Sequence, residues 1–214
     1  MGWSRRIWLS HCSVLAMSLP VMGAQAAPAR RAILVVGDSL SAEYGLQRGS
    51  GWVALLEKRL ARERIEAALV NASISGDTTS GGRSRLGALL QEHRPTHVLI
   101  ELGGNDALRG LPLDSTRDNL AAMARAAASG GAKVMLLGMQ VPPNYGRKYS
   151  DDFAKLFATV AKQEGASLVP FLLKGVADVA RAPQLFQPDR IHPTEEAQPL
   201  MLENVWPVLR PWLK

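Results

Sequence analysis

The chain has 214 residues, of which 47% are hydrophobic and 21% charged, so it can bury one sizeable core and is not a disordered polyelectrolyte. Without the leader described next, 23 basic and 19 acidic residues remain, and a dispersed net charge of +4 does not indicate nucleic-acid binding. Cys12 is the only cysteine, which excludes an internal disulfide framework and a cysteine-rich zinc site.

The first 26 residues have the three parts of a secretory signal peptide. Arg5 and Arg6 precede a largely apolar run over residues 7–23, and residues 24–26 form a small-x-small cleavage signal. The run is interrupted by polar residues and falls short of the roughly 20 apolar residues of a spanning helix. We predict cleavage near Ala26, a mature protein that is periplasmic or secreted without a stable membrane anchor, and one domain over residues 27–214. The arginine pair is also similar to a twin-arginine motif, so the export route stays open.

From residue 31 onward, short apolar runs alternate with longer amphipathic stretches. The runs predict strands buried on both faces at residues 32–36, 67–70, 98–102, 134–137 and 167–169. The amphipathic stretches predict helices at residues 52–65, 83–93, 115–128, 151–164 and 195–209, the last broken or kinked by Pro199 and Pro207. This alternation predicts a parallel sheet inside a three-layer α/β/α sandwich, with functional groups at the carboxyl edge of the strands.

The first predicted strand runs directly into a glycine and then Asp38 and Ser39. A serine at the end of a central strand can act as a nucleophile, and its own backbone N–H can stabilise an oxyanion. The alternative is that Asp38 and Ser39 only cap a turn.

The second and third strands also end in small polar loops. Gly76 offers a backbone N–H without side-chain obstruction, and Asn105, after two glycines, offers a neutral amide donor suited to an oxyanion. Taken singly, an ordinary turn at Gly76 and helix or turn capping by Asn105 and Asp106 are alternative interpretations.

Near the carboxyl end, Asp189 precedes His192 by three residues, so the carboxylate can orient the imidazole ring. His93 and His97 are expected to be solvated or to cap elements. No histidine or carboxylate cluster has metal-ligand spacing, so no metal site is predicted. All four loops fall at one predicted edge and together supply a nucleophile, oxyanion donors, a base and its orienter, which predicts serine-based acyl transfer.

These blocks resemble those of the SGNH (GDSL) hydrolases, with Ser39, Gly76, Asn105 and His192 as the four named residues. Residues 71–78, 101–106 and 143–146 are closer still to the bacterial periplasmic thioesterase, lysophospholipase and arylesterase group.

The resemblance implies a flavodoxin-like sheet of five parallel strands and a catalytic set of Ser39, Asp189 and His192. The oxyanion hole would comprise the backbone N–H groups of Ser39 and Gly76 and the side chain of Asn105. It further implies a hydrolase of acyl esters, thioesters, aryl esters and lysophospholipids, acting in lipid metabolism through an acyl-Ser39 intermediate and without metal or cofactor.

Two residues depart from the family pattern. Glu43 and Arg190 stand where relatives often have glycine, and we hypothesise that their opposite charges pair across the mouth of the site.

Specificity is expected to come from loops. Leu108 and Leu111 in residues 108–113 would form an apolar wall for an acyl chain, although packing under the next helix is an equal alternative. Tyr145, in residues 139–149, would contribute to a second wall or lid, and Ile191 would lie beside the catalytic histidine.

Two other functions stay open. A carbohydrate or peptidoglycan O-deacetylase would use the same catalytic groups, and a non-catalytic flavodoxin-like binding module would hold a nucleotide or flavin at the same sheet edge. Acyl-chain length, leaving group, stereoselectivity and oligomeric state are not encoded in these patterns.

Overall fold

The computed structural model describes Met1, residues 31–141 and residues 143–213. The predicted signal peptide beyond Met1, the cleavage site at Ala26 and the predicted start of the domain at residue 27 lie outside the described residues.

Five parallel strands form one sheet in the order β2-β1-β3-β4-β5. Their bounds are Arg31–Gly37 (β1), Ala67–Asn71 (β2), His97–Glu101 (β3), Lys133–Leu137 (β4) and Ser167–Val169 (β5). β1 pairs with β2 on one side and β3 on the other, so the strand order reverses direction at the junction of β1 and β3. In open α/β sheets, ligands bind outside the carboxyl ends of the strands at such a switch point.

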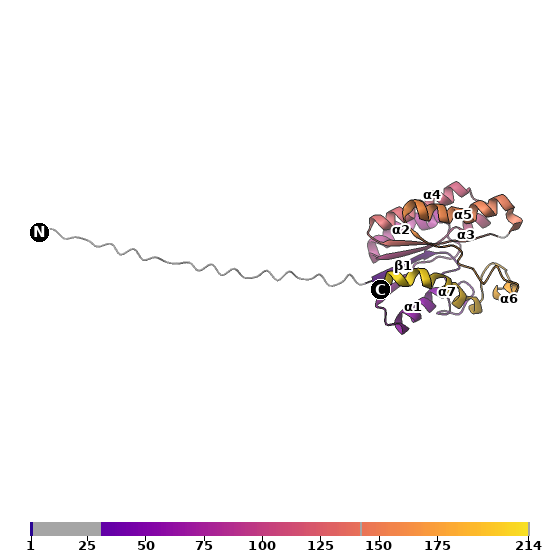
Figure 1. Cartoon of the computed structure of the whole chain (residues 1–214), viewed down its shortest axis with the longest axis horizontal. Coiled ribbons are helices and arrows are strands. Elements are labelled where there is room, and N and C mark those ends of the chain that lie inside the picture. The colour runs from indigo at the N-terminus through magenta and orange to yellow at the C-terminus, as the bar shows by residue number, and fades with distance from the viewer. Residues whose placement is uncertain (2–30, 142, 214) are drawn as a thin grey trace.

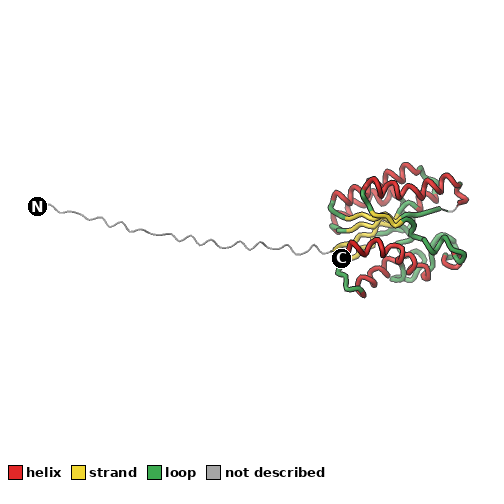
Figure 2. Tube along the Cα trace, viewed as in Figure 1, coloured by secondary structure: helices red, strands yellow, loops and turns green. Residues whose placement is uncertain are grey.

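Helices cover both faces of the sheet and make the predicted three layers (Figure 1). One layer contains α2 (Thr79–His93), α4 (Leu113–Ser129) and α5 (Arg147–Glu164), and the other contains α1 (Trp52–Arg62) and α7 (Gln198–Leu209). Figure 2 shows the strands between these two groups of helices. The α/β class and the flavodoxin-like five-stranded parallel sheet are thereby confirmed.

The central strands carry the core. Every residue of β1 from Ile33 onward and every residue of β3 is buried, as their uninterrupted apolar runs predict. Each buried Val, Ile or Leu side chain stabilises the fold by roughly 1.5–3 kcal/mol relative to an exposed one. The prediction of full burial is wrong for the edge strands β2 and β5, which are only partly buried because each has a neighbour on one side alone.

Helix ends differ from the predicted ones for local reasons. α2 begins four residues early because the hydroxyl of Thr78 accepts the N–H of Gly81 and caps the helix. α7 is continuous through Pro207, so a break predicted there is wrong. The predicted helix 195–209 is instead divided just before Pro199, between the 3-10 turn η2 (Glu195–Ala197) and α7, and Pro199 lies in the first turn of α7, where an N–H has no intrahelical partner anyway. Short helices α3 (Gly104–Leu108) and α6 (Ala182–Leu185) were not predicted, and neither were the 3-10 turns η1 (Pro143–Tyr145) and η3 (Arg210–Leu213).

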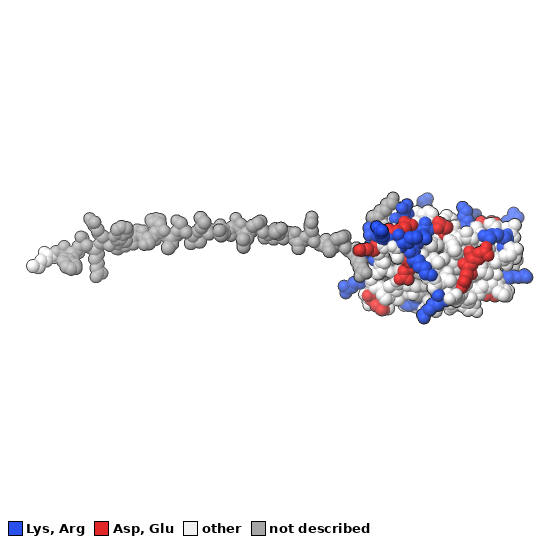
Figure 3. All heavy atoms as spheres, turned by 90° about the horizontal axis from the view of Figure 1, so that it is seen from below, with Lys and Arg blue, Asp and Glu red and all other residues white. Residues whose placement is uncertain are grey.

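His97 and the surface of the domain lie away from the carboxyl edge of the sheet. His97 is buried rather than solvated, with its ring stacked on Trp212, and burial lowers its pKa. Acidic and basic side chains are interspersed on the face shown in Figure 3. None of the described helices combines the length and apolar character that crossing a membrane requires.

Candidate active site

The predicted residues of the first three strands meet at one edge of the sheet. Ser39 follows β1, Gly76 lies in the loop after β2, and Asn105 lies in the first turn of α3, directly after β3. Because β2, β1 and β3 are parallel neighbours, their carboxyl ends lie side by side. The three loops therefore converge at the switch point of the sheet.

Asp189 and His192 belong to a separate segment, residues 186–193, which we call the histidine loop. An isolated antiparallel bridge between Phe186 and Pro193 closes this loop at its base. Inside it, the backbone N–H of Gln187 donates to the carbonyl of His192 at 2.8 Å. The loop is therefore held in one shape and presents the imidazole to the sheet edge.

Ser39, His192 and Asp189 form one hydrogen-bonded series. Oγ of Ser39 lies 2.9 Å from Nε2 of His192, and Nδ1 of the same ring lies 2.7 Å from Oδ2 of Asp189. With Nδ1–H donating to the carboxylate, Nε2 of the neutral ring accepts the serine proton. Hydrogen bonds from the ring and from the backbone N–H groups of His192 and Ile191 lower the pKa of Asp189 to about 2. This geometry can activate a serine hydroxyl as a nucleophile.

Tyr44 supports the imidazole from the side. Its ring centroid lies 4.2 Å from that of His192, and the planes are tilted by 34°. The side-chain amide of Gln187 donates to the carbonyl of Tyr44 at 2.9 Å, which ties this aromatic contact to the histidine loop. The sequence pattern did not predict this role for Tyr44.

The three amide groups predicted to form the oxyanion hole lie in the loops that converge at this edge. The backbone N–H groups of Ser39 and Gly76 donate to no protein group within the described part of the chain. Nδ2 of Asn105 donates to Oδ2 of Asp38 at 3.0 Å, which fixes the amide and leaves its second N–H available. Gly76 has a φ of +79°, a conformation that favours glycine, and Nη2 of Arg109 donates to its carbonyl at 2.8 Å.

Two buried carboxyl groups lie beneath the serine turn. Oε2 of Glu101 accepts the N–H of Asp38 at 3.2 Å and the hydroxyl of Ser41 at 2.8 Å. Burial raises the pKa of Asp38 to about 6. Burial, and then the neighbouring Asp38, raise the pKa of Glu101 well above its usual value. Both shifts favour the uncharged form of the carboxyl group, and burial acts most strongly on Glu101.

Gly37 allows this close approach. It is paired in register with Glu101, and a Cβ at position 37 would lie 2.8 Å from Oε2 of Glu101 and 2.9 Å from Oγ of Ser41. The glycine before the serine turn is thus required by the buried acid as well as by the turn.

The loop that carries Gly76 is anchored by α2. Arg85 forms an ion pair with Asp77 at 2.8 Å and also donates to the carbonyl of Ala72. Buried Asp106 accepts the backbone N–H of Thr79 at 2.9 Å and its hydroxyl at 2.5 Å, which joins α3 to the start of α2. Asp106 therefore caps a distant helix, not the next turn.

A cavity of about 420 Å³ opens beside Ser39 and His192. Three predicted specificity residues, Leu108, Tyr145 and Ile191, line it. Leu111 does not, because its N–H donates to the carbonyl of Asp106 and holds it in the turn before α4. The other apolar lining residues are Leu40, Met139, Val141, Phe171, Leu173, Ala177 and Phe186. Pro142, part of the predicted second wall, lies outside the described residues.

The hypothesised pair of Glu43 and Arg190 is not formed. The Glu43 carboxylate instead accepts the N–H of Gly49 at 3.0 Å and the N–H of Gly51 at 2.8 Å. These bonds turn the carboxylate toward its own loop and away from Arg190. Across residues 31–141 and 143–213, no group of three or more His, Cys, Asp or Glu side chains is placed to hold a metal ion.

Residues 35–199 match the GDSL-like lipase/acylhydrolase family. The chain is 52% identical over 209 residues to the esterase TesA of Pseudomonas aeruginosa, which covers 98% of this chain and 100% of that protein. It is 38% identical over 185 residues to thioesterase 1/protease 1/lysophospholipase L1 of Escherichia coli, covering 86% of each.

The fold is also similar to a solved structure. The psychrotrophic esterase EstA of Pseudoalteromonas sp., in a crystal structure inhibited by monoethylphosphonate, superposes with a TM-score of 0.80 and 41% identity. The superposition covers 86% of this chain and 98% of that one.

Proposed function

The chain belongs to the GDSL-like lipase/acylhydrolase family and is an ester hydrolase, and we propose that Ser39 carries its reaction through a covalent acyl intermediate. The observation that supports this most directly is the hydrogen-bonded series from Ser39 through His192 to Asp189. Each partner is within 3 Å of the next, so the proton path requires no rearrangement.

In the acylation step, Nε2 of His192 takes the proton of Ser39 as Oγ attacks the acyl carbon. His192 then returns that proton to the departing alcohol or thiol, and the acyl group stays on Ser39. In the second step His192 takes a proton from water, the resulting hydroxide attacks the acyl carbon, and the carboxylic acid leaves as Ser39 regains its proton. Asp189 stays ionised and orients the ring throughout.

The N–H groups of Ser39, Gly76 and Asn105 stabilise the oxyanion of each tetrahedral intermediate. Preorganised donors of this kind contribute roughly 2.7–4 kcal/mol each to the transition state. The bond from Asn105 to buried Asp38 holds the amide in place before the substrate arrives, so little reorganisation accompanies the reaction.

The acyl chain occupies the 420 Å³ cavity, whose lining is largely apolar beyond the reacting groups. This favours esters and thioesters of small or medium acyl chains, including aryl esters and lysophospholipids. The printed names of the relatives, an esterase and a thioesterase/lysophospholipase, are consistent with this substrate class.

The test is hydrolysis of p-nitrophenyl esters of two to sixteen carbons by wild-type protein, Ser39→Ala and Ser80→Ala. Ser80 is an exposed serine of α2 and serves as the matched control. We expect Ser39→Ala to lower kcat by at least about 10⁴-fold. A fluorophosphonate probe, in which the serine oxygen displaces fluoride from phosphorus, should add its mass to the peptide that contains Ser39.

Two results would change the proposal. Equal turnover by Ser39→Ala and Ser80→Ala would exclude Ser39 as the nucleophile. A sharp optimum at two carbons, with no turnover of longer chains, would move the assignment to an O-deacetylase.

We further propose that the enzyme acts outside the cytoplasm after cleavage near Ala26. The charged start, apolar run and small-residue cleavage signal of residues 1–26 support this. Mass spectrometry of the protein from a periplasmic fraction should give the mass of residues 27–214; an uncleaved chain would contradict it.

A further inference from the structure

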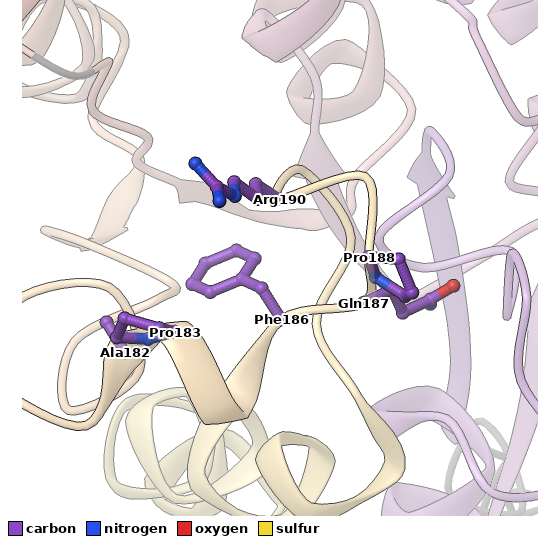
Figure 4. Close-up of a pocket in the computed structure, with 6 residues that line it drawn as sticks. All are labelled: Ala182, Pro183, Phe186, Gln187, Pro188 and Arg190. Carbon is purple, nitrogen blue, oxygen red and sulfur yellow. The ribbon is translucent and has the colours of Figure 1, made fainter.

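A second hollow adjoins the catalytic cavity. Its volume is about 630 Å³, and it is lined by Ala182, Pro183, Phe186, Gln187, Pro188 and Arg190 (Figure 4). Phe186 and Arg190 also line the cavity that contains Ser39. The two spaces therefore share a boundary made of one aromatic and one cationic side chain.

The side chains of the hollow differ in what they do. The amide of Gln187 donates to the carbonyls of Tyr44 and Pro193, and in Figure 4 it points away from Phe186. Arg190 extends above the ring of Phe186, toward the side where Ala182 and Pro183 lie. Among the described residues that line the hollow, Arg190 is the one with a charged side chain.

The guanidinium of Arg190 has no protein partner. Within the described residues, its side chain forms no hydrogen bond or ion pair, and the carboxylate of the preceding Asp189 is occupied by His192 and two backbone N–H groups. Its charge at the boundary of the two spaces is therefore free to meet a ligand.

The backbone gives a second, independent observation. Arg190 has a φ of +59°, a left-handed conformation that costs a residue with a Cβ roughly 1–2 kcal/mol. Glu43 has nearly the same φ of +60°, but its carboxylate accepts two backbone N–H groups that offset this cost. At position 190 the backbone itself is held, because the N–H of Arg190 donates to the carbonyl of Gln187 at 2.9 Å. The histidine loop therefore fixes this residue at the boundary of the two spaces, while its guanidinium stays without a partner among the described residues.

We propose that Arg190 and this hollow bind an oxyanion, a phosphate or a carboxylate, on the leaving group of the ester while the acyl chain occupies the catalytic cavity. This rests on the proposed function, because the scissile carbonyl must be at Ser39. A guanidinium presents a planar fork of N–H donors that matches two oxyanion oxygens at once. The enzyme therefore prefers an ester with an anionic leaving group to its uncharged counterpart.

The test compares 1-octanoylglycerol with 1-octanoylglycerol 3-phosphate, both below their aggregation concentrations. The two substrates share the acyl chain and the ester and differ only in the phosphate. The readout is the ratio of kcat/KM for the anionic substrate to kcat/KM for the neutral one. A third substrate, glycerol carrying one octanoyl and one succinyl group, replaces the phosphate with a carboxylate.

We expect Arg190→Gln to lower the phosphate ratio about tenfold at low ionic strength, because one charge-assisted contact is lost, and 0.5 M NaCl to reduce the wild-type ratio. Arg190→Gly, which removes the strain with the charge, should give the same fall and guards against misfolding. The matched control is Arg181→Gln, since Arg181 is exposed next to the hollow and pairs with Glu196 at 2.7 Å.

The inference is overturned if Arg190→Gln leaves the phosphate and carboxylate ratios unchanged, or if Arg181→Gln lowers them equally, which would indicate a general surface charge effect. A lowered ratio for only one of the two anions identifies which oxyanion the hollow binds. Hydrolysis of none of the substrates by wild-type protein would contradict the proposed function itself, which separates the two failures.

Discussion

Replacing Glu101 by glutamine and by alanine should separate its hydrogen-bonding role from its charge. Glutamine keeps an acceptor for the N–H of Asp38 and the hydroxyl of Ser41 and carries no charge at any pH. At pH 4, where the acid is neutral when folded and mostly neutral when unfolded, the two side chains should differ by less than about 1 kcal/mol.

Alanine removes the acceptor altogether. Two buried donors lose their partner, at roughly 1–3 kcal/mol each, and the missing side chain leaves a cavity. We expect Glu101→Ala to lower the free energy of unfolding by on the order of 4 kcal/mol at pH 4, and this deficit should shrink as pH rises because alanine does not titrate.

The pH dependence is the sharper part of this prediction. The pKa of Glu101 is raised in the folded state, so its contribution to stability is full below its unfolded pKa of 4.5 and is lost as pH rises toward the folded pKa. One proton released on unfolding corresponds to about 1.4 kcal/mol per pH unit. Glu101→Gln does not bear this loss, so its stability relative to the wild type should rise with pH above 4.5, by up to about 1.4 kcal/mol per unit until the folded-state pKa is reached.

Asp38 titrates in both proteins. In the wild type its pKa, raised from 3.8 to about 6, removes on the order of 3 kcal/mol of stability as pH rises from about 4 to above 6. Because the two carboxyl groups influence each other, the difference between Glu101→Gln and wild type reports on the pair.

The measurement is urea unfolding, followed by circular dichroism, at pH 4, 5, 6 and 7. Glu57→Gln on the exposed face of α1 is the control for removal of one acidic side chain. A difference between Glu101→Gln and wild type that does not change with pH would show that Glu101 is ionised in the folded protein, and the reasoning would be wrong.

Three further substitutions test the site. Gly76→Ala meets no clash within 3.8 Å but cannot easily adopt φ +79°, so we expect kcat to fall roughly tenfold and Tm slightly; unchanged kcat for an octanoyl ester would show that the reaction does not depend on this backbone conformation. Asp189→Asn should lower kcat on the order of 10³–10⁴-fold with an unchanged circular dichroism spectrum, because the amide disfavours the reactive ring tautomer; a smaller loss would argue against Asp189 as the orienter. Gly37→Ala places a Cβ 2.8 Å from Glu101 and should lower stability by about 1–3 kcal/mol along with kcat, whereas wild-type stability in denaturant would contradict the packing argument.

The architecture was predictable because buried strands are continuously apolar in sequence, whereas the helices are amphipathic. Uninterrupted apolar runs coincide with β1, β3 and β4, whose positions are buried almost throughout. The same pattern does not reveal which strand lies at an edge, since β2 is equally apolar in sequence but has a neighbour on one side only. Hydrophobic periodicity also does not reveal where a capping contact, such as that between Thr78 and Gly81, begins a helix.

The loops that meet at the site were predictable because parallel strands bring their carboxyl ends to one edge. What could not be predicted are contacts between residues far apart in the chain. Ser39 and His192 are 153 residues apart in the sequence, and Tyr44, which contacts the imidazole ring, is almost as far from His192. Glu101 did leave a signal, an acidic residue inside an apolar run, but only its pairing with Gly37 and Asp38 shows its use.

Glu43 and Arg190 show why the remaining step needs coordinates. Both positions were singled out in the sequence, and opposite charges near one site suggested an ion pair. Both residues have left-handed backbones, but the carboxylate of Glu43 satisfies the N–H groups of Gly49 and Gly51, whereas the guanidinium of Arg190 satisfies nothing within the described residues. The same backbone conformation therefore leaves the two charges in different states: the carboxylate of Glu43 is used inside its own loop, whereas the guanidinium of Arg190 is fixed at the boundary of two spaces and open to a ligand.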